Sequence, residues 1–200
     1  MPEREFILGG QKSGKSRRAE LRARAWLDGG AARRAVLIAT AQPWDDEMRA
    51  RIARHRSERA ARVPGLRTVE EPLRLAETVA AHAAPDTLVV VDCLTLWLTA
   101  HRMPMTPAAP EPDLGADVGA DADADADADV AVRALIDAIG AARGPLVLVG
   151  NEIGLGVIPM GREVRAFVDA LGRLNQDVAA ACDRVTLMAA GLPLTLKEPA

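Results

Sequence analysis

The chain has 200 residues and a net charge of −3, a length that fits one domain with a core of its own. Aromatic residues make up 2% of the chain, which argues against a base-stacking platform for single-stranded nucleic acid. Eight of the 28 acidic residues lie between Glu111 and Asp129, and the remainder is only mildly basic. A duplex-binding protein is expected to be far more basic. We therefore expect no nucleic-acid partner.

The N-terminus and the cysteines favour a cytoplasmic location. Residues 1–5 are charged and lead straight into a short apolar run, so we expect no signal peptide. No apolar stretch approaches the roughly 20 residues that a membrane span needs. The cysteines, Cys93 and Cys182, have neither metal-site nor redox-pair spacing. We predict two buried thiols in a reducing compartment, with a disulfide as the alternative.

Short apolar runs alternate with amphipathic stretches along the chain. Strands are predicted at 5–8, 35–39, 66–69, 87–91, 145–149, 184–189 and 194–197, the last less marked. Helices are predicted at 15–27, 45–60, 72–83, 94–101, 129–142 and 162–181. Continuous aliphatic runs such as 88–91 are typical of parallel strands covered on both faces. The pattern predicts one α/β domain over 1–200, with three layers and a mostly parallel sheet.

One segment, 103–128, differs in composition from the rest. It carries four prolines and then an Ala-Asp repeat that runs up to Asp129. Such a segment buries little apolar area and its charges repel one another, so we predict a solvated, low-complexity loop inserted within the domain. An acidic metal-binding tract is the alternative, but the repeat lacks the glycine turn of a calcium loop.

The first predicted strand leads into a phosphate-binding motif. It fits the pattern G-x-x-x-x-G-K-[ST], or Walker A, and consists of Gly9, Gly10, Gln11, Lys12, Ser13, Gly14, Lys15 and Ser16. We expect Lys15 to reach the β- and γ-phosphates of a nucleotide and Ser16 to bind Mg²⁺. The motif lies between a predicted strand and a predicted helix, the context it requires. A glycine turn with an accidental Lys-Ser pair is the alternative.

A P-loop also needs an acidic residue for Mg²⁺ at the end of a neighbouring strand. Asp92 follows the strand predicted at 87–91, at the edge where α/β proteins bind ligands. We predict that Asp92 helps to bind Mg²⁺, with a helix N-cap as the alternative.

The helix predicted at 45–60 combines a histidine with many arginines. Asp45 is a plausible N-cap for this helix. His55 lies four residues from both Arg51 and Arg59, so the three share a face. Guanidinium groups there would bind phosphate oxygens and favour the neutral, nucleophilic imidazole. A solvated arginine-rich face with an incidental histidine is the alternative. The remaining histidines, at 82 and 101, are predicted to lie on the surface.

Two later segments carry polar groups. Asn151 and Glu152 follow the strand at 145–149 and precede a glycine-rich stretch, which indicates either a ligand-facing turn or an ordinary loop. The polar residues at 172–176 of the last predicted helix are otherwise interpreted as surface residues.

Several segments together resemble one enzyme family, the bifunctional adenosylcobinamide kinase/adenosylcobinamide-phosphate guanylyltransferases of cobalamin biosynthesis. The matching segments run in order along nearly the whole chain, leaving out the acidic segment. They are 9–17, 38–42, 45–48, 51–56, 68–72, 92–97, 151–159 and 172–176.

The resemblance implies a transferase with a RecA-like P-loop fold. A nucleoside triphosphate, ATP or GTP, would phosphorylate adenosylcobinamide, and GMP from GTP would then pass to adenosylcobinamide phosphate. The GMP would be carried on the histidine of the R-I-x-x-H motif, here His55, as a phosphoramidate. The resemblance also implies a homotrimer with sites near subunit boundaries. Further nucleotide contacts would come from Thr40, Ala41, Gln42, Arg59, Glu70 and Asp92.

Two other functions stay open from the sequence. A P-loop kinase of another small metabolite would not need His55. A nucleotide-dependent regulatory module would bind nucleotide tightly without acceptor-dependent turnover.

Overall fold

The computed structural model describes residues 3–103, 119–157 and 159–199, and these residues form a seven-stranded sheet. The strand order is β3-β2-β4-β5-β1-β6-β7, and every pairing is parallel except that of β6 with β7. The strands are β1 (Arg4–Gly9), β2 (Arg34–Ala39), β3 (Leu66–Glu70), β4 (Thr87–Asp92), β5 (Leu146–Val149), β6 (Arg184–Ala189) and β7 (Leu192–Lys197). The predicted α/β class and the predicted strands are confirmed.

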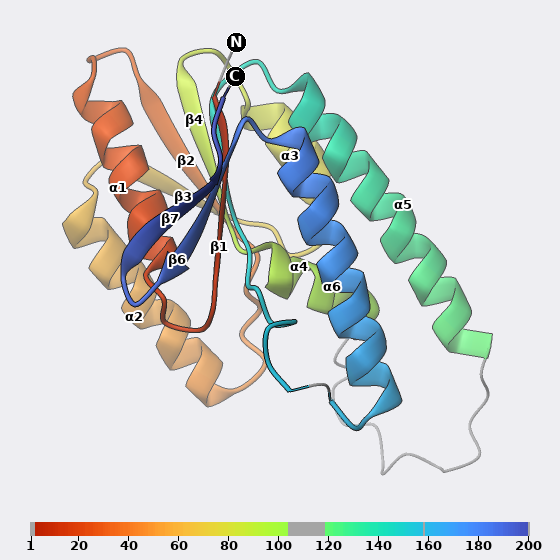
Figure 1. Cartoon of the computed structure of the whole chain (residues 1–200). Helices are drawn as coiled ribbons and strands as arrows, with labels where there is room; N and C mark the ends of the chain where they lie inside the picture. The colour runs from red at the N-terminus through yellow and green to blue at the C-terminus, as the bar shows by residue number, and fades with distance from the viewer. Residues whose placement is uncertain (1–2, 104–118, 158, 200) are drawn as a thin grey trace.

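Helices cover both faces of the sheet, so the fold has three layers (Figure 1). One face carries α1 (Lys15–Asp28) and α2 (Asp46–Arg62). The other face carries α3 (Leu75–His82), α4 (Leu94–Arg102), α5 (Gly119–Ala141) and α6 (Arg162–Ala181). Within the described part of the chain, no helix is both long and apolar enough to cross a bilayer.

The strands alternate their side chains between two apolar layers, because successive residues of a strand point to opposite faces. Phe6 and Leu8 of β1 pack with α6 and its neighbours, whereas Ile7 packs with α1. In β4, Val89 and Val91 join the first layer, and Leu88 and Val90 the second. Burial on both faces explains why these strands are continuous aliphatic runs.

The acidic segment is partly helical, which corrects the predicted loop at 103–128. Helix α5 begins at Gly119, ten residues before the predicted start, while 104–118 lie outside the described residues. Alanine favours helix strongly, and acidic residues suit a helix N-terminus. Arg102 of α4 also forms ion pairs with Asp125 and Asp129, which lie one turn apart on one face. A polar, acidic repeat can therefore be helical when a cation such as Arg102 pairs with its carboxylates.

Candidate functional site: a phosphate-binding loop and a histidine helix at one edge of the sheet

The loop between β1 and α1 makes a tight turn. Gly9 and Gly14 have φ values of +153° and +100°, and Lys12 is left-handed at +55°. The Ser13 amide donates to the carbonyl of Gly10 at 3.3 Å. A side chain at Gly9 would lie 2.5 Å from the Met188 carbonyl oxygen and 2.6 Å from Ser13 Oγ. The loop therefore requires glycine at this position.

The first turn of α1 is open to an anion. Its N-cap is Gly14, which has no side chain that could cap the helix, and the turn contains no acidic residue. Main-chain amides at such a terminus are free to bind phosphate oxygens. Ser13 Oγ is buried and lacks a hydrogen-bond partner among the described residues. The loop thus has the unsatisfied donors that a phosphate group would bind.

Lys15 is folded back onto the loop. Its ammonium group is largely buried and donates to the carbonyl oxygen of Gly10 at 2.7 Å. Burial lowers the pKa of Lys15, whereas the neighbouring Cys93 and Asp92 act in the opposite direction. The carbonyl that Lys15 contacts carries no net charge, so the positive charge of the ammonium group is not cancelled. This charge attracts an incoming phosphate group.

Asp92 ends β4 with a half-buried side chain, and the helix that follows is capped by the next residue. The N-cap of α4 is Cys93, so the N-cap alternative for Asp92 does not hold. A carboxylate here and the Ser16 hydroxyl on the first turn of α1 are both oxygen donors of the kind that Mg²⁺ prefers. The described residues contain no cluster of three or more acidic, cysteine or histidine residues for a metal. A P-loop does not need one, since the nucleotide supplies the remaining oxygens.

Both cysteines are free and buried, as predicted. Burial, with the Asp92 charge adding to it, raises the pKa of the Cys93 thiol to about 11. Burial also raises the pKa of Cys182 to about 12. Both thiols are therefore protonated near neutral pH and are poor nucleophiles.

The carboxyl ends of four neighbouring strands form a continuous row. Ala39 of β2 is in register with Glu70 of β3 on one side and with Asp92 of β4 on the other. Asp92 is in turn in register with Val149 of β5, and β5 pairs with β1. The predicted contacts Thr40, Ala41 and Gln42 continue β2 beyond this row, so they lie next to Asp92. The Thr40 hydroxyl is fully buried against Cys93, whereas Ala41 and Gln42 are half-buried.

His55 lies on α2, beside the edge strand β3. The predicted N-cap is confirmed, since Asp45 Oδ1 accepts from the Met48 amide at 2.6 Å. Arg59, one turn after His55, is buried and donates to Thr68 Oγ1 at 3.1 Å, and it lies 3.6 Å from Glu20 of α1. His55 itself is half-buried.

The other predicted groups on α2 differ in their surroundings. Arg51 is exposed, and Arg56 forms an ion pair with Glu70 at the end of β3. The two histidines that were predicted to lie on the surface are both half-buried. His82 contacts Arg67, and His101 packs edge-on against Trp97. Arg59 and Glu70 are therefore both engaged in contacts with other side chains.

The structure separates the two sets of predicted residues within one chain. The P-loop follows β1, and His55 lies beside β3, four strand positions away in the sheet. At about 4.8 Å for each strand, this offset is roughly 19 Å. A nucleotide on the P-loop is therefore near Asp92 and β5 of its own chain, whereas His55 lies on the helix beside the far edge strand β3.

A polar cluster next to the P-loop combines Asn151 and Glu152, for which the sequence left a ligand-facing turn or an ordinary loop open, with Asn175, which was interpreted as a surface residue. The Glu152 amide donates to the Gly9 carbonyl at 3.1 Å. Asn175 of α6 is 5% exposed, and its Nδ2 donates to Asn151 O at 3.1 Å and to Glu152 Oε2 at 3.4 Å. The interpretation of Asn175 as a surface residue was wrong, because α6 buries this position against the turn. Its spacing from Leu171 and Val178, on the apolar face of α6, could have indicated this.

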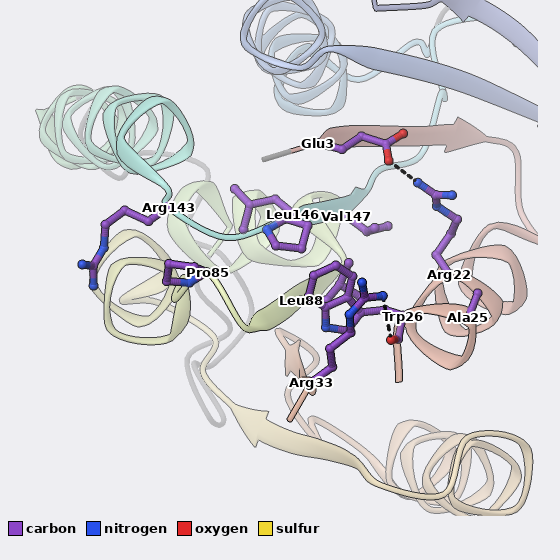
Figure 2. A pocket seen from close by; sticks show the side chains of 11 residues that line it. Glu3, Arg22, Ala25, Trp26, Arg33, Pro85, Leu88, Arg143, Leu146 and Val147 are labelled. Atoms are coloured by element: carbon purple, nitrogen blue, oxygen red, sulfur yellow. Dashed lines mark hydrogen bonds and ion pairs between the residues drawn. The ribbon is translucent and has the colours of Figure 1, made fainter. Parts of the chain in front are cut away.

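Two hollows lie at opposite edges of the sheet. One, of about 380 Å³, lies over the P-loop and is lined by Gly10, Gln11, Lys12, Ser13, Glu152, Leu155 and residues 187–190. The other, of about 500 Å³, is at the amino ends of the strands (Figure 2). Its cation Arg22 pairs with Glu3 and Glu5, and Arg33 stacks on Trp26 with 4.2 Å to the ring centroid. The first hollow is the one that contains the phosphate-binding groups.

The sheet order and the loop after β1 define a P-loop nucleotide-binding fold of the RecA-like class. The flagellar accessory protein FlaH of Methanocaldococcus jannaschii has a similar fold, with a TM-score of 0.52 at 12% identity. The match covers 98% of this chain and 79% of that one.

Residues 5–196 match the family model described as cobinamide kinase / cobinamide phosphate guanyltransferase, and the chain belongs to this family. It is 42% identical to the bifunctional adenosylcobalamin biosynthesis protein CobP of Pseudomonas aeruginosa, over 98% of this chain and 99% of that one. It is 36% identical to the bifunctional protein CobU of Escherichia coli, over 96% and 98% of the two chains.

Proposed function

We propose that this chain phosphorylates adenosylcobinamide with ATP or GTP and then transfers GMP from GTP to adenosylcobinamide phosphate. The products of the second reaction are adenosylcobinamide-GDP and pyrophosphate. The observation that carries the proposal is the presence of two phosphate-handling groups at one edge of the sheet. These groups are the P-loop after β1 and His55 beside β3, in a chain that belongs to the family throughout 5–196.

The kinase reaction takes place at the P-loop. The main-chain amides from Gly10 to Ser16 and the ammonium group of Lys15 bind the phosphates. Ser16 and Asp92 would hold Mg²⁺, which would supply charge neutralisation for the phosphates. Ala41 and Gln42, in the segment that follows β2, extend the nucleotide site next to Asp92.

The guanylyl transfer uses His55. A ring nitrogen attacks the α-phosphorus of GTP, the bond from that phosphorus to the bridging oxygen breaks, and pyrophosphate leaves. A phosphate oxygen of the acceptor then attacks the same phosphorus, and the electron pair of the P–N bond returns to the imidazole. The covalent intermediate divides one difficult transfer into two displacements. Arg51 and Arg59 lie one turn from His55 on the same face of α2, and Arg56, the next residue, pairs with Glu70.

We also propose that the active form is a homotrimer in which His55 of one protomer meets the P-loop of another. The offset of four strand positions within one chain supports this arrangement, because an in-line attack needs contact distances of about 3 Å. Helix α2 buries only Arg59 among its residues, and Leu192, Leu194 and Leu196 of β7 are more than half exposed, so both are candidates for subunit contacts. We place the enzyme in the cytoplasm, where Mg²⁺, nucleotides and reduced thiols coexist.

The test of the function is incubation of the protein with Mg²⁺ and GTP labelled at the α-phosphate, followed by denaturation. We expect acid-labile, base-stable label on the wild-type protein and on the control His82→Ala, but none on His55→Ala. Wild-type protein that never acquires label at saturating GTP would leave only a P-loop kinase without a covalent intermediate.

The test of the trimer is complementation between two inactive variants. Lys15→Ala and His55→Ala are unfolded and refolded together, and label and product formation are compared with each variant refolded alone. Recovered activity in the mixture is expected if the two groups come from different protomers. No recovery, with a monomer in analytical ultracentrifugation, would contradict the shared site.

A further inference from the structure

We propose that Glu152 is the general base of the kinase reaction and that Asn175 is its positioning residue. The inference rests on the proposed kinase function and assigns a role that the P-loop motif does not supply. A P-loop binds and polarises the nucleotide, but a separate group must accept the proton of the attacking hydroxyl.

Glu152 is fixed at the phosphate end of the loop. It follows β5, which pairs directly with β1, and its amide donates to the Gly9 carbonyl at 3.1 Å. Glu152 lines the same hollow of about 380 Å³ as Gly10, Lys12 and Ser13. A carboxylate in this position faces the space in which a phosphate group and an acceptor would meet.

The carboxylate is held by neutral donors on both oxygens. Glu152 Oε1 accepts from the Gly154 amide at 3.2 Å, and Oε2 accepts from Asn175 Nδ2 at 3.4 Å. The Asn151 amide before it donates to Thr95 Oγ1 of α4 at 2.9 Å. These bonds leave the second lone pairs of both carboxylate oxygens free for a proton donor.

Burial of the Asn175 side chain is unfavourable for the stability of the fold. Its Oδ1 is buried with no hydrogen-bond partner among the described residues, and an unpaired buried acceptor costs about 1–3 kcal/mol. A hydrophobic side chain would avoid that cost at this position on α6. The amide is therefore explained by what Nδ2 does, which is to orient Glu152 and the carbonyl of Asn151.

The other carboxylates at this edge are engaged elsewhere. Asp92 is assigned to Mg²⁺, and Glu70 pairs with Arg56. Glu71 accepts from the amides of Leu73 and Arg74 ahead of α3. Within the described ranges, Glu152 has no Lys, Arg or His nitrogen within 4.0 Å.

The step is a direct transfer to the hydroxyl. The O–H bond of the acceptor breaks and its proton passes to a carboxylate oxygen of Glu152. The hydroxyl oxygen forms a bond to the γ-phosphorus of the nucleotide as the bond to the β,γ-bridging oxygen breaks. The nucleoside diphosphate leaves with that electron pair, and Glu152 later releases the proton to water.

The experiment measures the two activities of Glu152→Gln separately. Kinase turnover is followed with adenosylcobinamide and ATP, and guanylylation with α-labelled GTP alone. We expect kcat of the kinase to fall about 10²–10⁴-fold, with KM for both substrates within about threefold of wild type. Label on His55 should be unchanged. Glu163→Gln, an exposed carboxylate in the first turn of α6, is the matched control and should retain both activities.

Chemical rescue distinguishes a base from a loop contact. In Glu152→Ala, added formate should restore kinase turnover in proportion to its concentration, since a carboxylate can enter the space. Asn175→Ala should lower kcat by about tenfold without changing KM, because the base is retained but less well oriented. Wild-type kcat in Glu152→Gln, or no formate rescue in a folded Glu152→Ala, would overturn the assignment. Wild-type protein without kinase activity would instead contradict the proposed function.

Discussion

The hydroxyl of Thr40 forms hydrogen bonds with both main-chain polar groups of Cys93. It donates to the Cys93 carbonyl at 2.7 Å and accepts from the Cys93 amide at 2.9 Å, with Thr40 1% exposed. The Thr40 amide also donates to the Asp92 carbonyl at 3.3 Å. The side chain directly after β2 therefore fixes the end of β4, where the proposed Mg²⁺ ligand Asp92 lies.

Replacing Thr40 by Val should lower both stability and nucleotide affinity. The isosteric change leaves the Cys93 amide buried without a partner, at about 1–3 kcal/mol, whereas the Cys93 carbonyl still accepts from the Trp97 amide at 3.2 Å. Urea unfolding and titration with GTP in the presence of Mg²⁺ measure the two effects. Thr40→Ser keeps the hydroxyl and serves as the control. An unchanged unfolding midpoint in Thr40→Val would show that these bonds contribute nothing.

The two glycines that open the P-loop should respond differently to alanine. At Gly9 an added methyl group meets the Met188 carbonyl and Ser13 Oγ, whereas at Gly10 no heavy atom lies within 4 Å. We expect Gly9→Ala to cost about 1–3 kcal/mol of unfolding free energy and to weaken nucleotide binding by at least tenfold. Gly10→Ala should unfold like wild type. Equal stabilities of the two variants, measured by thermal and urea unfolding, would contradict the close approach of β6.

A buried carboxylate connects α2 to the core. Glu20 of α1 is 3% exposed and forms ion pairs with Arg59 and Arg62. Glu20→Gln leaves the buried Arg59 guanidinium without a counter-charge, and we expect a loss of about 3–5 kcal/mol. Label on His55 should fall as well, because α2 has little other packing. Glu58→Gln removes a carboxylate that is half exposed and should change stability by less than 1 kcal/mol.

The first turns of α5 should depend on Arg102. Its guanidinium pairs with Asp125 and with Asp129, at 2.7 Å for the second. Arg102→Ala leaves these like charges on one helix face without a counter-charge. Amide hydrogen exchange over 119–129, followed by mass spectrometry, should become at least tenfold faster. Arg133→Ala, an exposed cation of the same helix, should leave the exchange unchanged. Equal rates in the two variants would mean that alanine propensity alone holds these turns.

The sequence alone determined the layers of the fold and the chemistry of its main loop. Aliphatic runs such as 88–91 predicted buried parallel strands, and the glycines and Lys15 predicted a phosphate site after β1, because these signals are local. The repeat at 119–128 was predicted to be a loop because its composition is polar. Its helical state depends in part on Arg102, a contact between segments.

Only the tertiary structure decided which polar groups lie together. Asn175 is 23 residues from Glu152 in the chain, yet α6 buries its amide beside that carboxylate. Conversely, His55 and Lys15, both predicted catalytic residues, are separated by the strand order of the sheet. Side-chain proximity of this kind depends on which strand pairs with which, and local propensities carry no information about that pairing.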